Sequence, residues 1–294
     1  MATETTTFGA GKRESHDAAA FYRRRLLEHA PDPVSGEAVE PPPGLLDRLF
    51  CRSSEHMVEI PDDCVALMVT SPPYNVGKEY DEDLSLSDYL DLLHRVLKET
   101  FRVLEPGGRA AVNVANLGRK PYLPLNHHVA GLLADIGFSL RGEIIWVKAA
   151  GAGGSCAWGS WRSARNPTLR DVHEYVLVAG KGPYRRTRTG TDTIGRDEFL
   201  EATTSVWNIA PASARRIGHP APFPVELPRR LIELYTFEGD LVLDPFVGSG
   251  TTAVAAAESG RHFVGYDVSE AYIEMARARL GAVELKPSEE VAEG

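Results

Sequence analysis

The sequence contains few cysteines and no long apolar run. Cys51, Cys64 and Cys156 are scattered through the 294 residues without C-x-x-C spacing, which argues against structural zinc and fits a reducing compartment. There is no uninterrupted apolar run of about 18 residues, and residues 1–15 are polar, without a signal-like apolar stretch. We therefore expect a cytoplasmic protein with no membrane segment and no metal.

The chain also has fewer basic than acidic residues, but the basic residues are concentrated in its middle part. The formal net charge is −9, yet residues 141–230 contain 14 Lys and Arg against 8 Asp and Glu. A locally basic middle in an acidic chain suits an enzyme that holds a polyanion on one face. Uneven charge is common on solvated surfaces, so this pattern alone does not identify the partner.

The chain has the composition of an enzyme with one large domain, since 43% of its residues are hydrophobic. Residues 1–44 form a partly disordered N-terminal extension that ends in the stiff run Pro-Pro-Pro-Gly at 41–44. Residues 285–294 read as a flexible acidic tail. Residues 45–284 are then the folded domain.

Strand-like and helix-like segments alternate from Val65 onward, which predicts an α/β fold, a doubly wound and mostly parallel sheet. Residues 181–219 lack any period and are too long for a simple connection, so we interpret 181–218 as a functional insertion. The expected strands are Val65–Val69, Arg109–Val114, Glu143–Val147, Glu174–Ala179, Leu241–Leu243 and Phe263–Tyr266. The expected helices run from Ser85 to the turn at 106–108, over Val129–Asp135 and Val225–Tyr235, from Thr251, and over Glu270–Leu280.

A glycine-rich turn joins a strand to a helix in the second half, with the sequence LVLDPFVGSGTT at 241–252. Gly248 and Gly250 allow a tight turn and close approach of a ligand, and the following helix offers unpaired N–H groups. Asp267 follows the next strand, where a carboxylate accepts hydrogen bonds from ribose hydroxyls. The pattern indicates a nucleoside cofactor; a turn without ligand and a nicotinamide dinucleotide both remain open.

The segment TSPPYN at 70–75 ends a predicted buried strand in the first half. Its two prolines fix the backbone so that a carbonyl points outward, beside the Ser71 hydroxyl and the Tyr74 ring. Two acceptors that grip the hydrogens of an exocyclic amine favour a pyramidal nitrogen, and an aromatic ring stacks on an extruded base. The plain alternative is that the prolines only end the strand, and for Asn75 the alternative is that it only shapes the turn.

Together the two segments resemble the amino-methyltransferases of DNA, in the permuted order with the catalytic motif before the cofactor loop. The resemblance spans residues 65–280 and also includes the strings HPAPFP at 219–224, EPGGR at 105–109, GEIIWVK at 142–148 and VHEY at 172–175. It implies a Rossmann-like methyltransferase fold, S-adenosyl-L-methionine as cofactor, no metal, and double-stranded DNA as partner. It also leaves room for a cognate restriction endonuclease, and oligomeric state is not predicted.

The resemblance assigns roles residue by residue. In the catalytic tetrapeptide Ser71, Pro72, Pro73 and Tyr74, the serine hydroxyl and the Pro72 carbonyl hold the target amine and the tyrosine stacks on the base. The cofactor is surrounded by Asp244, Pro245, Phe246, Gly248, Gly250, Thr251, Asp267, His219 and Phe223. Target recognition lies in 181–218, with Arg185, Arg186, Arg188, Arg215 and Arg216 available for phosphates or guanine edges, unless this is only a solvated loop.

The base is predicted from the residue before the two prolines. Relatives with serine there mostly modify cytosine N4, so we expect a cytosine-N4 DNA methyltransferase, with adenine N6 as the alternative. An RNA or protein-amide methyltransferase, a nicotinamide oxidoreductase and a non-catalytic DNA-binding relative are further alternatives. The segment Gly151–Trp161 fits a mobile lid or DNA-facing loop as well as plain packing.

Overall fold

The computed structural model describes residues 36–73, 84–117, 121–148, 159–169, 171–212 and 223–282. All of them belong to one compact unit, Pro33–Gly294, and Met1–Asp32 is a separate unit outside the described residues. The predicted tail at 285–294 and most of the predicted N-terminal extension also lie outside the described residues.

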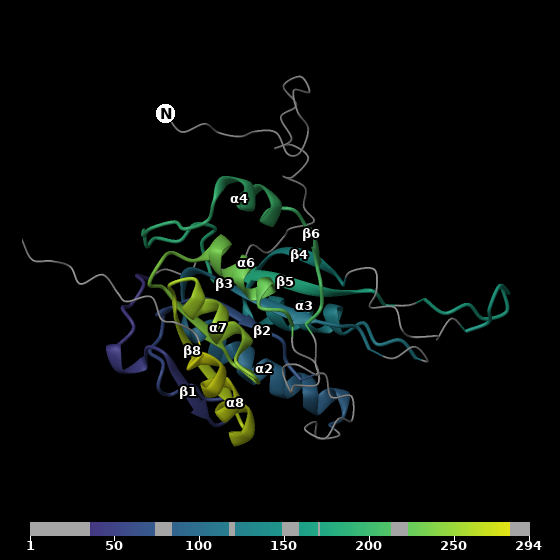
Figure 1. Cartoon of the computed structure of the whole chain (residues 1–294). Helices are drawn as coiled ribbons and strands as arrows, with labels where there is room; N and C mark the ends of the chain where they lie inside the picture. The colour runs from purple at the N-terminus through teal and green to yellow at the C-terminus, as the bar shows by residue number, and fades with distance from the viewer. Residues whose placement is uncertain are drawn as a thin grey trace, which may run out of the picture. The chain divides into compact units, whose positions relative to one another are not determined.

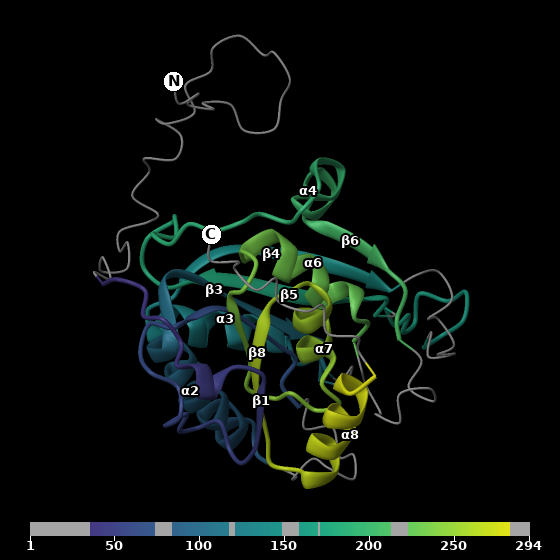
Figure 2. The same cartoon turned by 60° about the vertical axis from the view of Figure 1, so that its left-hand side comes forward.

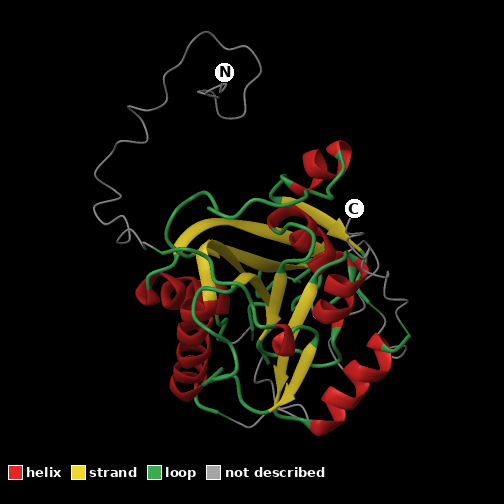
Figure 3. Cartoon of the chain, turned by 90° about the vertical axis from the view of Figure 1, so that its left-hand side faces the viewer, coloured by secondary structure: helices red, strands yellow, loops and turns green. Residues whose placement is uncertain are grey.

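An eight-stranded sheet forms the centre of the described unit (Figures 1 and 3). The strand order is β1-β8-β7-β2-β3-β5-β4-β6, and only β5 runs against the others. The mostly parallel sheet predicted from the alternation is therefore confirmed. The strands are β1 (Arg48–Cys51), β2 (Val65–Thr70), β3 (Leu104–Val114), β4 (Ser139–Lys148), β5 (His173–Gly180), β6 (Val206–Ile209), β7 (Leu241–Asp244) and β8 (His262–Asp267).

Helices cover both faces of this sheet, because the strands are apolar on both sides and two separate cores result (Figures 1 and 2). On one face α2 (Leu86–Val103) and α3 (Leu125–Ile136) pack with the short 3-10 helix η1 (Pro43–Leu45). On the other face lie α4 (Arg196–Ala202), α6 (Glu226–Tyr235), α7 (Thr251–Glu258) and α8 (Glu270–Leu280).

The helix after Ser85 begins as its capping pattern predicts, since the Asp88 N–H donates to Ser85 Oγ at 3.2 Å. The predicted end of this helix, at the turn 106–108, lies too far along the chain. The helix stops at Val103, and the Glu-Pro-Gly-Gly string lies inside β3. Gly107 has φ +83°, and a Cβ there would lie 2.7 Å from Arg186 Cα. The glycine thus lets the segment after β5 cross β3 in close contact.

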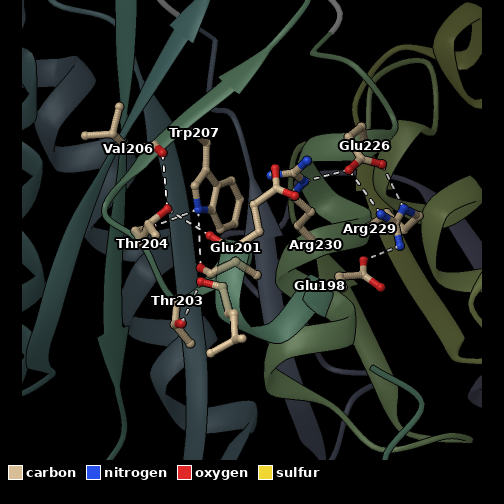
Figure 4. Close-up of polar contacts among 11 residues, drawn as sticks. Glu198, Glu201, Thr203, Thr204, Val206, Trp207, Glu226, Arg229 and Arg230 are labelled. Atoms are coloured by element: carbon tan, nitrogen blue, oxygen red, sulfur yellow. Dashed lines mark hydrogen bonds and ion pairs between the residues drawn. The ribbon is translucent and has the colours of Figure 1, made fainter. Parts of the chain in front are cut away.

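The interpretation of 181–218 as one irregular insertion needs correction, because it contains α4 and a strand of the sheet, β6. Strand β6 pairs with β4 from Ile145↔Val206 to Lys148↔Ile209. Trp207 of β6 is buried, and its Nε1–H donates to the carbonyls of Ala202 and Thr204 (Figure 4). This part of the chain therefore belongs to the domain itself.

Ion pairs fasten α4 to α6 beside Trp207 (Figure 4). Arg229 reaches Glu198 at 2.6 Å and Arg230 reaches Glu201 at 2.9 Å, while Glu226 accepts from both arginines. The side chains of Arg229 and Arg230 are partly buried, with exposed fractions of 32% and 14%. Their ion pairs and the burial of the Trp207 indole together hold α4 and β6 in place.

No helix among the described residues has the length and apolar character needed to cross a membrane.

Candidate active site

Three of the predicted motifs end neighbouring strands at one edge of the sheet. Strand β2 pairs with β7 through Leu67↔Val242, and β7 pairs with β8, where Asp244 faces Gly265. Parallel strands end at the same edge, with neighbouring backbones about 4.8 Å apart. Ser71, Asp244 and Asp267 therefore lie on adjacent strand ends, at what we call the carboxyl edge.

Asp244 ties the catalytic and cofactor segments to each other. Its Oδ1 accepts from Thr70 Oγ1 at 2.7 Å and from the Phe246 N–H at 3.1 Å. Burial raises the pKa of Asp244 to about 6, against hydrogen bonds from Thr252 and Thr70 that lower it. Asp244 is 3% exposed, and its carboxylate stabilises the turn through these buried hydrogen bonds within the chain.

The turn that follows needs glycine at two places. Gly248 and Gly250 have φ +48° and +79°, in the left-handed region that other residues rarely adopt. A Cβ at Gly250 would also lie 2.7 Å from Ala276 Cβ of α8. The turn leads directly into α7, whose amino end faces the carboxyl edge.

Asp267 joins the end of β8 to the same turn. Its Oδ2 accepts from the Gly248 N–H at 3.0 Å, and its Oδ1 accepts from the Ser269 N–H at 2.8 Å. Each carboxylate oxygen has a further lone pair, so the half-buried side chain retains acceptor capacity for a ligand. Burial raises its pKa, although these backbone N–H groups lower it.

Two supports of the turn have no signal in the sequence. Arg279 Nη1 of α8 donates to Ser249 O at 2.6 Å and to Thr251 Oγ1 at 3.0 Å. Ser54, after β1, donates from Oγ to Pro245 O at 2.8 Å. Both contacts join residues far apart along the chain, and local spacing cannot show them.

The other cofactor candidates have different placements. Phe246 is half-buried and packs on the core that holds α2 and α3, whereas Phe223 packs on the opposite core. Thr251 is buried at the start of α7. His219 lies outside the described residues.

The catalytic tetrapeptide is described up to Pro73. Ser71 and Pro73 are half-buried and Pro72 is buried, whereas Tyr74 lies outside the described residues. The Asn113 amide of β3 is 3.5 Å from Ser71 Oγ. Asn113 could not be foreseen from the sequence, because a single asparagine inside a strand has no distinguishing pattern.

The arginines after β5 lie at the edge of the sheet opposite Ser71. Because β5 is antiparallel, it ends at the opposite edge, where Gly180 pairs with Arg109 in β3 and with Ser139 at the start of β4. Arg186 is a structural residue. Its side chain is 9% exposed and pairs with Glu105 and with Asp240, the latter at 2.7 Å.

Arg188 and Arg185 share this location. Arg188 pairs with Glu40 at 2.9 Å and lies 3.8 Å from Glu105. Arg185 is exposed, but it lies in the same segment, one residue from the buried Arg186. These three arginines thus lie at the edge of the sheet opposite Ser71, and Arg186 and Arg188 take part in ion pairs within the domain. Arg215 and Arg216 lie outside the described residues.

Two other connections leave the carboxyl edge. The first runs from Lys148 at the end of β4 to His173 at the start of β5, and the second follows Ile209 at the end of β6. Within the first, residues 159–169 extend beyond the ends of β4 and β5, as the teal segment at the right of Figure 1. They include Trp161, which is 68% exposed, and the exposed Arg162 and Arg165.

Among the described residues, no three His, Cys, Asp or Glu side chains gather as metal ligands would.

Comparison with known proteins identifies the family. Residues 65–278 match the DNA methylase family of N6 and N4 methyltransferases. The type II methyltransferase M.MthZI of Methanothermobacter thermautotrophicus is 30% identical over 282 residues, which cover 83% of this chain and 79% of that protein. M.HpaI of Haemophilus parainfluenzae is 29% identical, with 79% and 74% covered.

Solved structures agree with this match. The DNA modification methylase TTHA0409 of Thermus thermophilus superposes with a TM-score of 0.65 at 31% identity, covering 82% of this chain and 97% of that one. Its complex with S-adenosyl-L-methionine superposes with a TM-score of 0.64 at 29% identity, covering 80% and 93%. The chain belongs to the DNA methylase family of N6 and N4 amino-methyltransferases.

Proposed function

We propose that this protein transfers a methyl group from S-adenosyl-L-methionine to the N4 amine of cytosine in a specific DNA sequence. The observation that carries the proposal is the 2.7 Å hydrogen bond between Thr70 and Asp244. It joins the segment of Ser71 to the glycine turn, so that an amine held at one and a nucleoside held at the other are neighbours. We assign the activity to residues 45–284.

The residues of the turn fit this cofactor. The left-handed glycines allow the tight turn between β7 and α7, the amino end of α7 suits the carboxylate of an amino acid, and Asp267 suits a ribose. When bound, S-adenosyl-L-methionine supplies a methyl group on a positively charged sulfur. Pro245, Phe246 and Phe223, with His219, complete the proposed surroundings.

Ser71 and the Pro72 carbonyl accept hydrogen bonds from the two hydrogens of the target amine. Because the lone pair of an exocyclic amine is delocalised into its ring, these contacts favour the pyramidal nitrogen that can accept a methyl group. Pro73 keeps the backbone rigid, and Tyr74 stacks on the base once it has left the duplex. Serine at position 71 supports cytosine N4, and adenine N6 is the second candidate.

We further propose that DNA approaches the carboxyl edge through residues 149–172 and 210–222. The exposed Trp161, Arg162 and Arg165 belong to the first segment, and Arg215 and Arg216 belong to the second. Arginines suit phosphates and guanine edges. The names of type II relatives support a cognate restriction endonuclease as a partner of the same sequence specificity.

Ligand-induced stabilisation tests the cofactor assignment. S-adenosyl-L-methionine should raise the melting temperature, because it binds the folded state only, while NAD should not. Asp267→Ala should weaken this shift, measured against the melting temperature of the free variant, because the variant also loses the hydrogen bonds from the Gly248 and Ser269 N–H groups. An equal shift with NAD, or an undiminished shift in the variant, would contradict the assignment.

A further inference from the structure

A row of polar side chains crosses three strands directly beside Ser71. Asn113 of β3, Glu174 of β5 and Lys148 of β4 come together there, because β5 pairs with both β3 and β4. The Asn113 amide nitrogen is 2.7 Å from Glu174 Oε2 and 3.5 Å from Ser71 Oγ. The other carboxylate oxygen, Oε1, pairs with Lys148 Nζ.

The chemistry of these groups fixes the direction of each hydrogen bond. An ionised carboxylate only accepts, so the Asn113 group that faces Glu174 is the NH2. One hydrogen of this NH2 goes to Glu174, and the same nitrogen faces Ser71, where it offers its second hydrogen. The Ser71 oxygen is therefore held as an acceptor on the side of Asn113, which limits the rotation of its hydroxyl.

Stability alone does not explain this arrangement. Asn113 is 2% exposed and Glu174 is 7% exposed, and burying a charge is unfavourable unless it is paired. Apolar residues of similar size often replace buried ion pairs without loss of stability. Lys148 itself lies over the Trp146 ring, 5.3 Å from its centroid, and the Trp146 Nε1–H donates to Ile209 O at 2.9 Å. Lys148, held against Trp146, therefore forms one end of this row of side chains, and Ser71 forms the other.

We propose that Glu174, paired with Lys148, is a positioning residue for methyl transfer and that it acts on Ser71 through Asn113. This inference rests on the proposed role of Ser71 as an acceptor from the target amine. The negative charge polarises the Asn113 amide, and the amide fixes Ser71 Oγ in the orientation in which its remaining acceptor capacity faces the amine. The row lies on β3, β5 and β4, whereas the cofactor turn follows β7, on the other side of β2.

Glu174→Gln is the matched test, because glutamine keeps the size of the side chain and removes its charge. We expect kcat to fall about tenfold or more, with the KM for DNA and the dissociation constant of S-adenosyl-L-methionine nearly unchanged. Lys148→Met should lower kcat in the same way, and Lys148→Arg should restore it. Glu143→Gln, an exposed carboxylate of the same sheet region, should behave like the parent.

A double-mutant cycle separates positioning from a local structural effect. In an Asn113→Leu background the link to Ser71 is missing, so Glu174→Gln should cause no further fall in kcat. The same cycle in Ser71→Ala gives a second measurement if the leucine variant fails to fold. The proposal would be overturned if Glu174→Gln lowered kcat equally in the parent and in the Asn113→Leu background. It would also be overturned if Glu174→Gln alone kept the kcat of the parent. A parent that methylates no base would instead contradict the proposed function, and with it the role of Glu174.

Discussion

Asp244 and Asp267 end neighbouring strands but use their carboxylates differently. Asp244 is enclosed and accepts hydrogen bonds from Thr70 and the Phe246 N–H, so it builds the turn. Asp267 is half-buried and accepts one backbone N–H on each oxygen. The first carboxylate therefore stabilises the turn, and the second is the one for which we propose a contact with the ribose.

The raised pKa of Asp244 predicts a pH-dependent stability. Its ordinary value is 3.8 and its value in the fold is about 6. Between these values the folded protein keeps a proton that the unfolded chain has released. The free energy of unfolding should therefore fall, by up to about 3 kcal/mol, as the pH rises from about 4 to above 6.

Denaturant unfolding of the parent and of Asp244→Asn at several pH values checks this. Asparagine does not titrate, so the variant should lack this component, and the difference between the two proteins should change across the window. Parallel pH profiles from pH 4 to 7 would show that Asp244 does not titrate as its burial implies.

At the scale of elements, the turn before α7 depends on its contact with α8. Gly250→Ala would place a methyl group 2.7 Å from Ala276 Cβ at a φ of +79°. We expect a loss of stability of about 1–3 kcal/mol and weaker binding of S-adenosyl-L-methionine, measured by unfolding and by calorimetry.

Gly131→Ala in α3 is the matched control, since no atom lies within 4 Å of its added Cβ. It should stabilise the protein by up to about 1 kcal/mol, because alanine favours a helix more than glycine does. If both substitutions had the same effect, the close contact between the turn and α8 would not matter.

Most of the elements could be predicted from the sequence, including the four-residue strand β7, but β1 and β6 could not. Strand β2 and helices α2 and α8 follow from apolar runs, helical spacing and caps. Strand β1 has four residues without alternation, and β6 alternates over only four residues within a polar stretch. Both take part in the sheet through pairing with distant strands, which local patterns do not record.

The site shows the same division. The turn with Gly248 and Gly250 and the segment of Ser71 have local signatures, because special backbone geometry needs particular residues. Arg279 and Asn113 reach the site through tertiary contacts and carry no such signature. Glu174 lies in the string VHEY of the resemblance, but the string does not indicate its contact with Asn113. The location of Arg186 could not be predicted for a related reason: the direction of β5 decides at which edge of the sheet the following segment emerges.

At the scale of the whole molecule, the net charge of −9 requires DNA to meet a locally basic surface. We place this surface at the carboxyl edge. Replacing Arg162 and Arg165 together by Ala should weaken DNA binding. The slope of log affinity against log salt should become shallower by about 0.9 for every phosphate that the variant no longer neutralises.

Arg185→Ala, at the opposite edge, is the control and should leave both quantities unchanged. Affinity for S-adenosyl-L-methionine should stay the same in all three proteins. A stronger effect of Arg185 than of Arg162 and Arg165 would place the DNA surface at the other edge, contrary to the proposal.

The most direct measurement is the identity of the methylated base. DNA treated with the protein and S-adenosyl-L-methionine is digested to nucleosides and analysed by mass spectrometry, with Ser71→Ala as the matched variant. We expect N4-methylcytosine in a specific sequence and a clearly lower rate for the variant, because the amine loses an acceptor. N6-methyladenine would contradict the assignment of the base, and no methylated base at all would contradict the proposed reaction.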